Sequence, residues 1–347
     1  MNRLTLSCTW YWRALVLLGS GAWLAGPSPA AAQALRFRFT RPKMGSPFNL
    51  TLFCTDSSRA ARLADSCYAL VDSLNGIYSD YDPQSEVSRL AARPGLSQPQ
   101  ALSPELLAML LRCRQAWFLS RGSFDVSIGA LTHCWRAARA AHRFPDRREI
   151  RRARRAGGFR HLDLDPKACT LQWDCAGMQL DLGGIVKGYA AQRVIDFLRG
   201  QGITCALADA GGDLAVLGTP PGQRGWRIGV NLPGQADSLW RTPLQLDHGA
   251  VATSGDLYRY ILHRGRRYSH LIDPRTGYGV TTGRNVTVVA TDGAEADWLA
   301  TACSILPLRR ARRLADARGA ALLIAEAHKG RIRTYPNAAW VRLLPPD

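Results

Sequence analysis

Two oxygen-bearing side chains, Asp297 and Thr301, stand four residues apart in the helix-like segment 294–306 (AEADWLATACSIL). Asp292 precedes the segment as a candidate N-cap, and Glu295 follows Asp292 by three residues, as in a capping box. Because four residues make about one helical turn, the two oxygens should point the same way. A carboxylate with a hydroxyl suits Mg²⁺, which keeps water and phosphate ligands. Taken alone, the pair is better explained by ordinary helix contacts.

A glycine pair in the segment 180–189 (LDLGGIVKGY) separates an expected strand from an expected helix. Free backbone amides at the start of a helix bind anions such as phosphate, and Asp181 and Lys187 lie on either side of the turn. The spacing matches neither the dinucleotide motif GxGxxG nor the P-loop motif GxxxxGKS/T. A tight turn that needs a positive φ is an equally good explanation for this segment alone.

His270 and Asp273 lie in the segment YSHLIDPRTG, at the end of an expected strand and before a Pro/Gly turn. Together with Ser254 they suggest a hydrolase triad, but the sequence has no GxSxG motif. Two further polar turns carry aromatic residues, YSDYDP at 78–83 and GSFDVS at 122–127. None of these segments identifies a reaction by itself.

The elements that would position these side chains mix strands and helices without regular βαβ alternation. Helices are expected at 56–78, 104–120, 146–156, 185–198, 294–306 and 308–317, and strands at 35–54, 160–182, 203–218, 226–232, 243–253, 258–273, 285–291 and 320–325. The segment 79–90 is expected to be a polar turn. The pattern predicts an α+β fold with largely antiparallel sheets flanked by helices, not a doubly wound fold.

Residues 1–32 have the organisation of a secretory signal peptide. Two arginines precede an apolar stretch at 14–25, and small residues then favour cleavage near Ala32–Ala34. A retained membrane anchor is the less favoured alternative, because a span needs about 20 apolar residues. No cysteine follows the apolar stretch directly, so a lipoprotein is not expected. The sequence therefore predicts an exported, periplasmic protein.

The chain is strongly basic, with a formal net charge of +18. Nine arginines lie between Arg136 and Arg155, against only Asp146 and Glu149. The segment 146–156 has helical composition, so a solvated helix face is the first interpretation of this run. Peripheral contact with a membrane or an acidic partner is the second interpretation. Nucleic acid is not expected as a partner.

The cysteines point to no particular function. Eight of them follow residue 32, and they form no CxxC pattern of the kind that binds zinc. Cys169 and Cys175 flank a short hairpin-like segment, so a local disulfide is one option and two free thiols are the other. Cys303 lies in an apolar helical run and is expected in the core.

Eight segments taken in order carry more information than any one of them. They are MGSPF (44–48), YSDYDPQSEVSRL (78–90), GSFDVSIGAL (122–131), LDLGGIVKGYA (180–190), ADAGGDLAVLG (208–218), VATSGDLYRY (251–260), RYSHLIDPRTGYGV (267–280) and ADWLATA (296–302). This series resembles the ApbE family of FAD:protein FMN transferases over about residues 37–325. The resemblance implies a single ApbE-like domain at 35–345, in which two intertwined subdomains hold FAD between them.

The resemblance also implies a set of site residues. Asp297 and Thr301 match side-chain ligands of Mg²⁺, with the backbone of Gly184 as a further ligand, so this pair is now interpreted as a metal site. His270 matches a histidine implicated in catalysis. The positions that match the FAD site are Met44, Tyr81, Ser123, Phe124, Asp125, Asp181, Lys187 and Ile272.

The implied reaction moves FMN from FAD to a threonine or serine hydroxyl of an acceptor protein, and AMP is released. Mg²⁺ and Lys187 would neutralise charge on the diphosphate, and His270 would take the proton of the hydroxyl. The acceptor is expected to be an extracytoplasmic redox protein. Two alternatives stay open: an FAD pyrophosphatase that uses water as the nucleophile, and a non-catalytic FAD-binding assembly factor.

Overall fold

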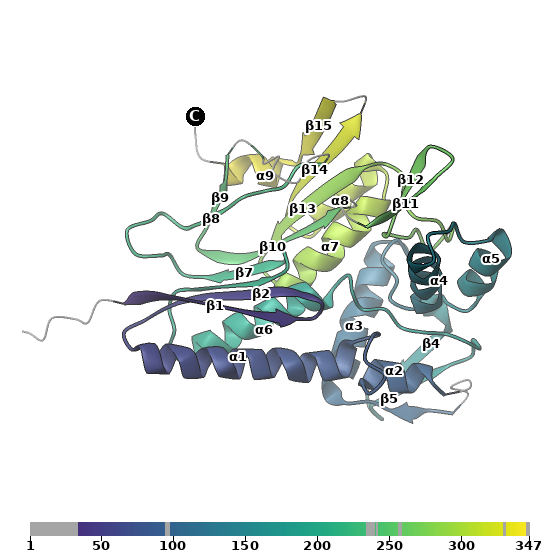
Figure 1. The fold of residues 1–347 in the computed structure, drawn as a ribbon, viewed down its shortest axis with the longest axis horizontal. Coiled ribbons are helices and arrows are strands. Elements are labelled where there is room, and N and C mark those ends of the chain that lie inside the picture. The colour runs from purple at the N-terminus through teal and green to yellow at the C-terminus, as the bar shows by residue number, and fades with distance from the viewer. Residues whose placement is uncertain are drawn as a thin grey trace, which may run out of the picture. The chain divides into compact units, whose positions relative to one another are not determined.

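An eight-stranded sheet is the main element of the computed structural model, which describes residues 34–93, 98–233, 240, 242–255, 259–328 and 331–344. Its order is β1-β2-β6-β7-β10-β13-β14-β15, and each neighbouring pair is antiparallel (Figure 1). The strands are β1 (Leu35–Lys43), β2 (Ser46–Cys54), β6 (Ala206–Ala210), β7 (Leu214–Leu217), β10 (His248–Gly255), β13 (Arg284–Ala290), β14 (Ala321–His328) and β15 (Arg331–Pro336). The expected signal peptide at 1–32 lies outside the described residues.

One face of this sheet is covered by helices. They are α1 (Ser57–Tyr78), α6 (Val186–Gly200), α7 (Gly293–Ile305) and α8 (Leu308–Ala317). Because strand residues alternate between faces, Val288 of β13 packs into the core beneath the helices, whereas Val289 packs into a second core on the opposite face. β13 is therefore buried on both faces, whereas the edge strands β1 and β15 are more exposed.

The second face is covered by a short hairpin and the last helix. The hairpin strands are β8 (Trp226–Ile228) and β9 (Leu244–Leu246), and the helix is α9 (Ala338–Leu343). Trp340 of α9 is completely buried in this core, beside Leu323 of β14. Asn337 caps α9 by accepting a hydrogen bond from the backbone N–H of Trp340.

Smaller elements lie between α1 and α6 in the sequence, and most of them add apolar side chains to the core beneath the helices. They are α2 (Glu86–Ala91), β3 (Gln100–Ala101), α3 (Pro104–Leu119), α4 (Gly129–Ala140), α5 (Arg147–Arg155), β4 (Leu162–Asp165) and β5 (Thr170–Trp173). A third apolar cluster joins α4 and α5 to the hairpin of β11 (Tyr260–His263) and β12 (Arg266–Ser269). Leu131, Trp135, Ile150 and Ile272 are its buried members.

The predicted α+β class with antiparallel sheets and flanking helices is confirmed, and the six predicted helices end within about two residues of their expected bounds. The expected turn at 79–90 is wrong in its second half, because the Ser85 side chain accepts a hydrogen bond from the Ser88 N–H and starts α2. The short strands expected over 160–182 are present as β4 and β5, but the expectation that the last of them ends at Leu180–Leu182 is wrong. The N–H of Asp181 donates to the Val126 carbonyl, outside any named strand.

The cysteines are free thiols throughout the described chain. The Cys169 thiol donates to the Leu102 carbonyl and the Cys175 thiol to the Arg155 carbonyl. The option of a local disulfide between them is therefore not realised. The prediction that Cys303 lies in the core is confirmed, because this side chain is completely buried.

Gly188 allows α6 and α7 to approach closely. A Cβ added there would lie 2.1 Å from the Gly293 carbonyl oxygen and 2.8 Å from the Asp297 Cβ. Because the carbonyl belongs to the backbone, it cannot move aside without separating the helices. We expect Gly188→Ala to lower the free energy of unfolding by about 1–3 kcal/mol, as measured by urea denaturation.

Gly200 at the end of the same helix supplies the control. No heavy atom of the described residues outside its immediate neighbourhood lies within 4 Å of a Cβ added at this position. Gly200→Ala is therefore expected to be neutral or slightly stabilising. Equal stability of the two alanine variants would contradict the close contact at Gly188.

Candidate functional site

The start of α6 and the middle of α7 bring the three predicted metal ligands together. Asp292 caps α7 by accepting a hydrogen bond from the Glu295 N–H, as expected from the sequence, but the Glu295 carboxylate accepts from Trp298 and Arg318 and does not complete a capping box. Asp297 is only 4% exposed, and its Oδ2 accepts a hydrogen bond of 3.1 Å from the Gly188 N–H. A Cβ added at Gly184 would lie 2.9 Å from Thr301 Oγ1, so the glycine turn rests directly against Thr301.

A second hydroxyl joins this group. Ser254 Oγ of β10 lies 3.3 Å from Thr301 Oγ1, although the sequence had suggested Ser254 only as part of an unconvincing triad. No three His, Cys, Asp or Glu side chains gather into a metal site within the described ranges. The available donors are therefore one carboxylate, two hydroxyls and backbone carbonyls. Such a set suits Mg²⁺ completed by water and phosphate, not zinc.

The charge around Asp297 also fits a bound cation. Burial raises the pKa of this carboxyl well above its ordinary value, and the nearby charge of Asp213 adds to the increase. The Lys187 ammonium and the backbone amides of Gly188 and Lys187 oppose the increase only in part. A divalent cation at this position would favour the ionised carboxylate. The residues present therefore fit a magnesium ion.

Lys187 forms an ion pair that the sequence analysis did not identify. Its Nζ lies 2.9 Å from Oδ2 of Asp213, whose side chain is only 5% exposed. Burial alone would lower the pKa of Lys187, but the charges of Asp213 and Asp297 outweigh burial and raise it. The lysine is therefore held as a cation beside the glycine turn. Asp213 belongs to the motif ADAGGD, which contributed to the resemblance without an assigned role.

His270 follows β12 and is held as a neutral imidazole. Burial, together with the positive charges of Arg259, Arg139 and Lys187, lowers its pKa from the ordinary 6.5 to about 4. Its Nδ1 is buried and has no hydrogen-bond partner among the described residues. A neutral imidazole with a vacant nitrogen can accept a proton at neutral pH.

The low pKa of His270 makes the free energy of unfolding depend on pH. Between about pH 6.5 and pH 4 the unfolded histidine binds a proton and the folded one does not, so the free energy of unfolding falls as the pH falls through this window. We expect His270→Gln to flatten this pH dependence in urea denaturation. His142→Gln, at an exposed position, should keep the wild-type dependence. An unchanged slope in His270→Gln would contradict the buried, neutral imidazole.

The positions predicted to contact FAD fall into two groups. Met44 lies in the β1–β2 turn with a φ of 49°, and Tyr81 is 72% exposed. Phe124 is buried, with its ring 3.4 Å from a Cβ added at Gly184. Ser123 Oγ is buried and has no hydrogen-bond partner among the residues that the structure describes. Phe124 therefore lies against the glycine turn.

The second group consists of Asp125, Asp181 and Ile272, whose side chains already contact other parts of the protein. Asp125 accepts hydrogen bonds from the N–H groups of Ser127 and Phe159, which ties two loops together. Asp181 accepts from the Gly183 N–H at 2.8 Å, which shapes the glycine turn. The Ile272 side chain is buried in the third apolar cluster, against α4 and α5. These three side chains therefore stabilise the loops around the site.

A cavity of about 410 Å³ lies beside Asp125, between the end of α3 and the end of α5. Its walls include Trp117, Gly122, Asp125, Phe159, Arg154, Arg155 and Arg160. The predicted metal ligands are not among its lining residues. The cavity is therefore distinct from the Asp297 centre, although it shares Asp125 with the predicted FAD contacts.

Comparisons with known proteins identify the family of this chain. Residues 44–324 match the ApbE family. An FAD:protein FMN transferase from Klebsiella pneumoniae is 31% identical over 263 residues, covering 75% of this chain and 79% of the relative. Another from Vibrio cholerae is 28% identical over 330 residues, covering 94% of this chain and 97% of the relative.

Solved structures agree as well. The flavin transferase ApbE from Vibrio cholerae superposes with a TM-score of 0.80 at 26% identity, over 90% of this chain and 100% of that one. The ApbE protein from Thermotoga maritima gives a TM-score of 0.80 at 27% identity with the same coverage. The resemblance carried by the eight sequence segments is confirmed, and the chain belongs to the ApbE family.

Proposed function

We propose that this chain is an Mg²⁺-dependent FAD:protein FMN transferase that attaches FMN to a threonine or serine hydroxyl of an acceptor protein and releases AMP. Transfer of FMN from FAD is the activity of its named relatives in the family. The observation that carries the proposal is the convergence of Asp297, Thr301 and Gly184 beside the ion pair of Lys187 and Asp213. Oxygen atoms that can bind a metal therefore lie close to the Lys187 ammonium at the start of α6.

The diphosphate of FAD would be held by positive charge. Asp297, Thr301 and the Gly184 backbone would hold Mg²⁺, which when bound neutralises the charge that develops on the phosphates. Lys187 would bind the diphosphate through its ammonium, which Asp213 holds in place. The amides of the first turn of α6 are already engaged, because the Val186 N–H donates to the Leu182 carbonyl and the Gly188 N–H donates to Asp297.

His270 would act as the general base. Its neutral imidazole takes the proton from the acceptor hydroxyl, and the hydroxyl oxygen attacks the phosphorus on the riboflavin side of the diphosphate. A phosphoester bond to the acceptor forms while the bond between the two phosphates breaks, and AMP leaves with the bonding electron pair. The unpartnered Nδ1 of His270 supports this role.

The site of action is proposed to be the periplasm, with an extracytoplasmic redox protein as the acceptor. The organisation of residues 1–32 supports export. Among the described helices, none is long and apolar enough to cross a membrane. The exposed arginines of α5 would favour contact with an acidic surface, either of the acceptor or of an anionic membrane.

One incubation separates the proposed reaction from its alternatives. The mature protein is mixed with FAD, Mg²⁺ and a candidate acceptor, and covalent flavin is detected by fluorescence on a denaturing gel. A fluorescent acceptor band together with free AMP is the expected result. Free FMN and AMP without a labelled acceptor would indicate an FAD pyrophosphatase. Bound but intact FAD would indicate a carrier or assembly factor.

A further inference from the structure

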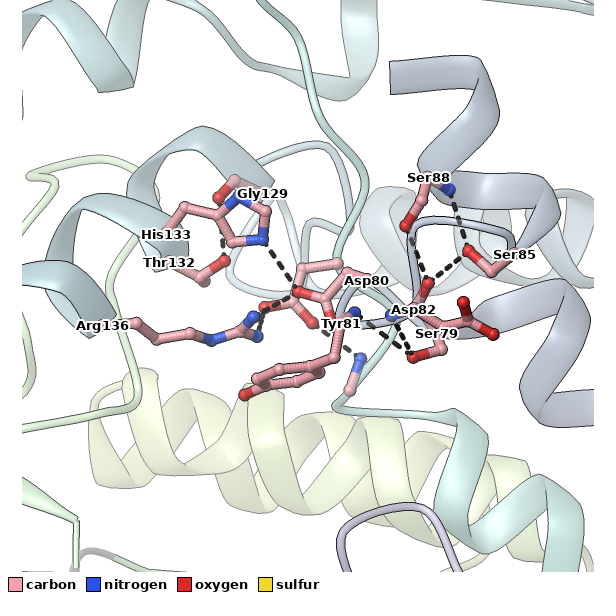
Figure 2. A network of polar contacts seen from close by, with 12 residues as sticks. Ser79, Asp80, Tyr81, Asp82, Ser85, Ser88, Gly129, Thr132, His133 and Arg136 are labelled. Carbon is pink, nitrogen blue, oxygen red and sulfur yellow. Dashed lines mark hydrogen bonds and ion pairs between the residues drawn. The ribbon is translucent and has the colours of Figure 1, made fainter. Parts of the chain in front are cut away.

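Arg136 of α4 connects two segments that the predicted FAD site uses. Its Nη2 donates a hydrogen bond of 2.8 Å to Oδ2 of Asp181, and its Nη1 donates to Oδ2 of Asp80. Its guanidinium carbon also lies 4.4 Å from the centre of the Tyr81 ring. Figure 2 shows this side chain extending from α4 over the ring. One guanidinium thus contacts two carboxylates and an aromatic ring.

Arg136 and its two carboxylate partners are largely buried. Its side chain is 24% exposed, and those of Asp80 and Asp181 are 10% and 12% exposed. His133, one turn earlier in α4, reaches the same carboxylate of Asp80 at 3.1 Å. Two of the five N–H groups of Arg136 donate to carboxylates, whose negative charges offset the charge of the guanidinium, so it would attract a phosphate of the ligand only weakly. Its role is to hold other residues in place.

The backbone that carries Tyr81 is fixed independently of its ring. Ser79 Oγ accepts hydrogen bonds from the N–H groups of Tyr81 and Asp82. The hydroxyls of Ser85 and Ser88 both donate to the Ser79 carbonyl (Figure 2). The turn therefore places the Tyr81 Cα, and Arg136 then determines where the exposed ring lies.

The other end of the arginine reaches the glycine turn. Asp181 accepts from Arg136 through Oδ2 and from the Gly183 N–H through Oδ1. Gly184, the next residue, rests against Thr301. The same guanidinium thus supports both an exposed aromatic ring and the turn beside the predicted metal ligands.

We propose that Arg136 is a positioning residue of the FAD site: it holds the Tyr81 ring as a stacking surface for a planar ring of the dinucleotide and fixes the glycine turn through Asp181. This inference rests on the proposed function, in which FAD is the substrate. A cationic group covers one face of the Tyr81 ring, and the ring remains 72% exposed for a ligand. A held ring loses less conformational entropy when the ligand stacks on it.

The test measures binding and turnover separately. FAD affinity is measured by quenching of flavin fluorescence for wild type, Arg136→Met, Arg136→Lys and a control, Arg62→Met, at an exposed position of α1. We expect FAD to bind about 10-fold more weakly to Arg136→Met, as the loss of a partly desolvated cation–π contact and of ring order implies. At saturating FAD, the kcat for transfer should change by less than about twofold, so that the effect falls on KM.

Arg136→Lys should bind FAD with intermediate affinity, because a single ammonium cannot bridge two carboxylates and also lie flat on the ring. Separate titrations with ADP and with FMN identify the stacked ring. Weaker ADP binding to Arg136→Met indicates the adenine, and weaker FMN binding indicates the isoalloxazine. If Arg136→Met binds FAD, ADP and FMN as wild type does, the proposal is overturned.

A double variant separates positioning from a purely structural role. Arg136→Met leaves two partly buried carboxylates without their shared partner, which lowers stability. Arg136→Met with Asp80→Asn removes one of these charges and should recover most of the apo Tm without recovering FAD affinity. Affinity that returns together with the Tm would mean that Arg136 only stabilises the fold.

The binding titration needs no acceptor and no turnover, so the two proposals can fail separately. Wild type that binds FAD but never transfers FMN would refute the proposed function, while the affinities of the Arg136 variants still decide the present inference. Wild type that binds none of FAD, ADP and FMN would overturn both.

Discussion

Replacing Asp297 by asparagine is expected to lower FMN transfer by at least about 10³-fold, which corresponds to about 4 kcal/mol of transition-state stabilisation. Asparagine keeps the size of the side chain and an oxygen that can accept the hydrogen bond from the Gly188 N–H. It removes the negative charge that would hold Mg²⁺. The helix should therefore remain in place while the metal site is lost.

Initial rates of transfer across a range of Mg²⁺ concentrations test this expectation. Asp292→Asn is the matched control, because asparagine also caps helices and Asp292 serves α7 as its N-cap. It should retain activity within about twofold of wild type. Wild type should also gain Tm when Mg²⁺ is added in the presence of FAD, because ligands that bind only the folded state stabilise it. Undiminished turnover by Asp297→Asn would refute the metal assignment.

The second large effect is expected at Lys187. Lys187→Met removes the cation beside the glycine turn and should lower transfer by about 10²–10³-fold, as loss of one preorganised charge contact does in other enzymes. It also leaves Asp213 buried without its partner. The free energy of unfolding should fall by about 2–3 kcal/mol, less than for a fully buried pair because Lys187 is partly exposed.

Asp213→Asn in the Lys187→Met background separates these two effects. The amide removes the buried charge, so the free energy of unfolding measured in urea should return close to the wild-type value. Transfer should stay low, because the cation is still missing. If the double variant regains activity, Lys187 contributes to the fold and not to the reaction.

Local sequence rules located the parts of the site that lie within one element. Asp297 and Thr301 face the same way because four residues make about one helical turn, and the Asp292 cap begins α7 as expected. The glycine turn followed by a helix at 183–189 likewise places Lys187 in the first turn of α6. These features depend on neighbours close in sequence, so a single segment is enough to predict them.

Other features could not be predicted from local sequence patterns, because the residues that contact one another are distant in sequence. α4 becomes a helix when Leu131, Trp135 and Ala138 are buried, although its polar and basic residues obscure that stripe. Arg136 lies 45 residues from Asp181 and 56 from Asp80. No periodicity relates these three residues, and only the packing of α4 beside both turns brings their charges together.

The amino-acid sequence by itself determined the α+β class, the helix that aligns Asp297 with Thr301 and, through eight ordered segments, the family. The tertiary structure alone decided which charges face one another: Lys187 with Asp213, and Arg136 with Asp80 and Asp181. The physical reason is that hydrophobic periodicity and capping act over a few residues along the chain. Electrostatic interaction and burial depend on distance in space, which is defined only once the helices and the sheet have packed.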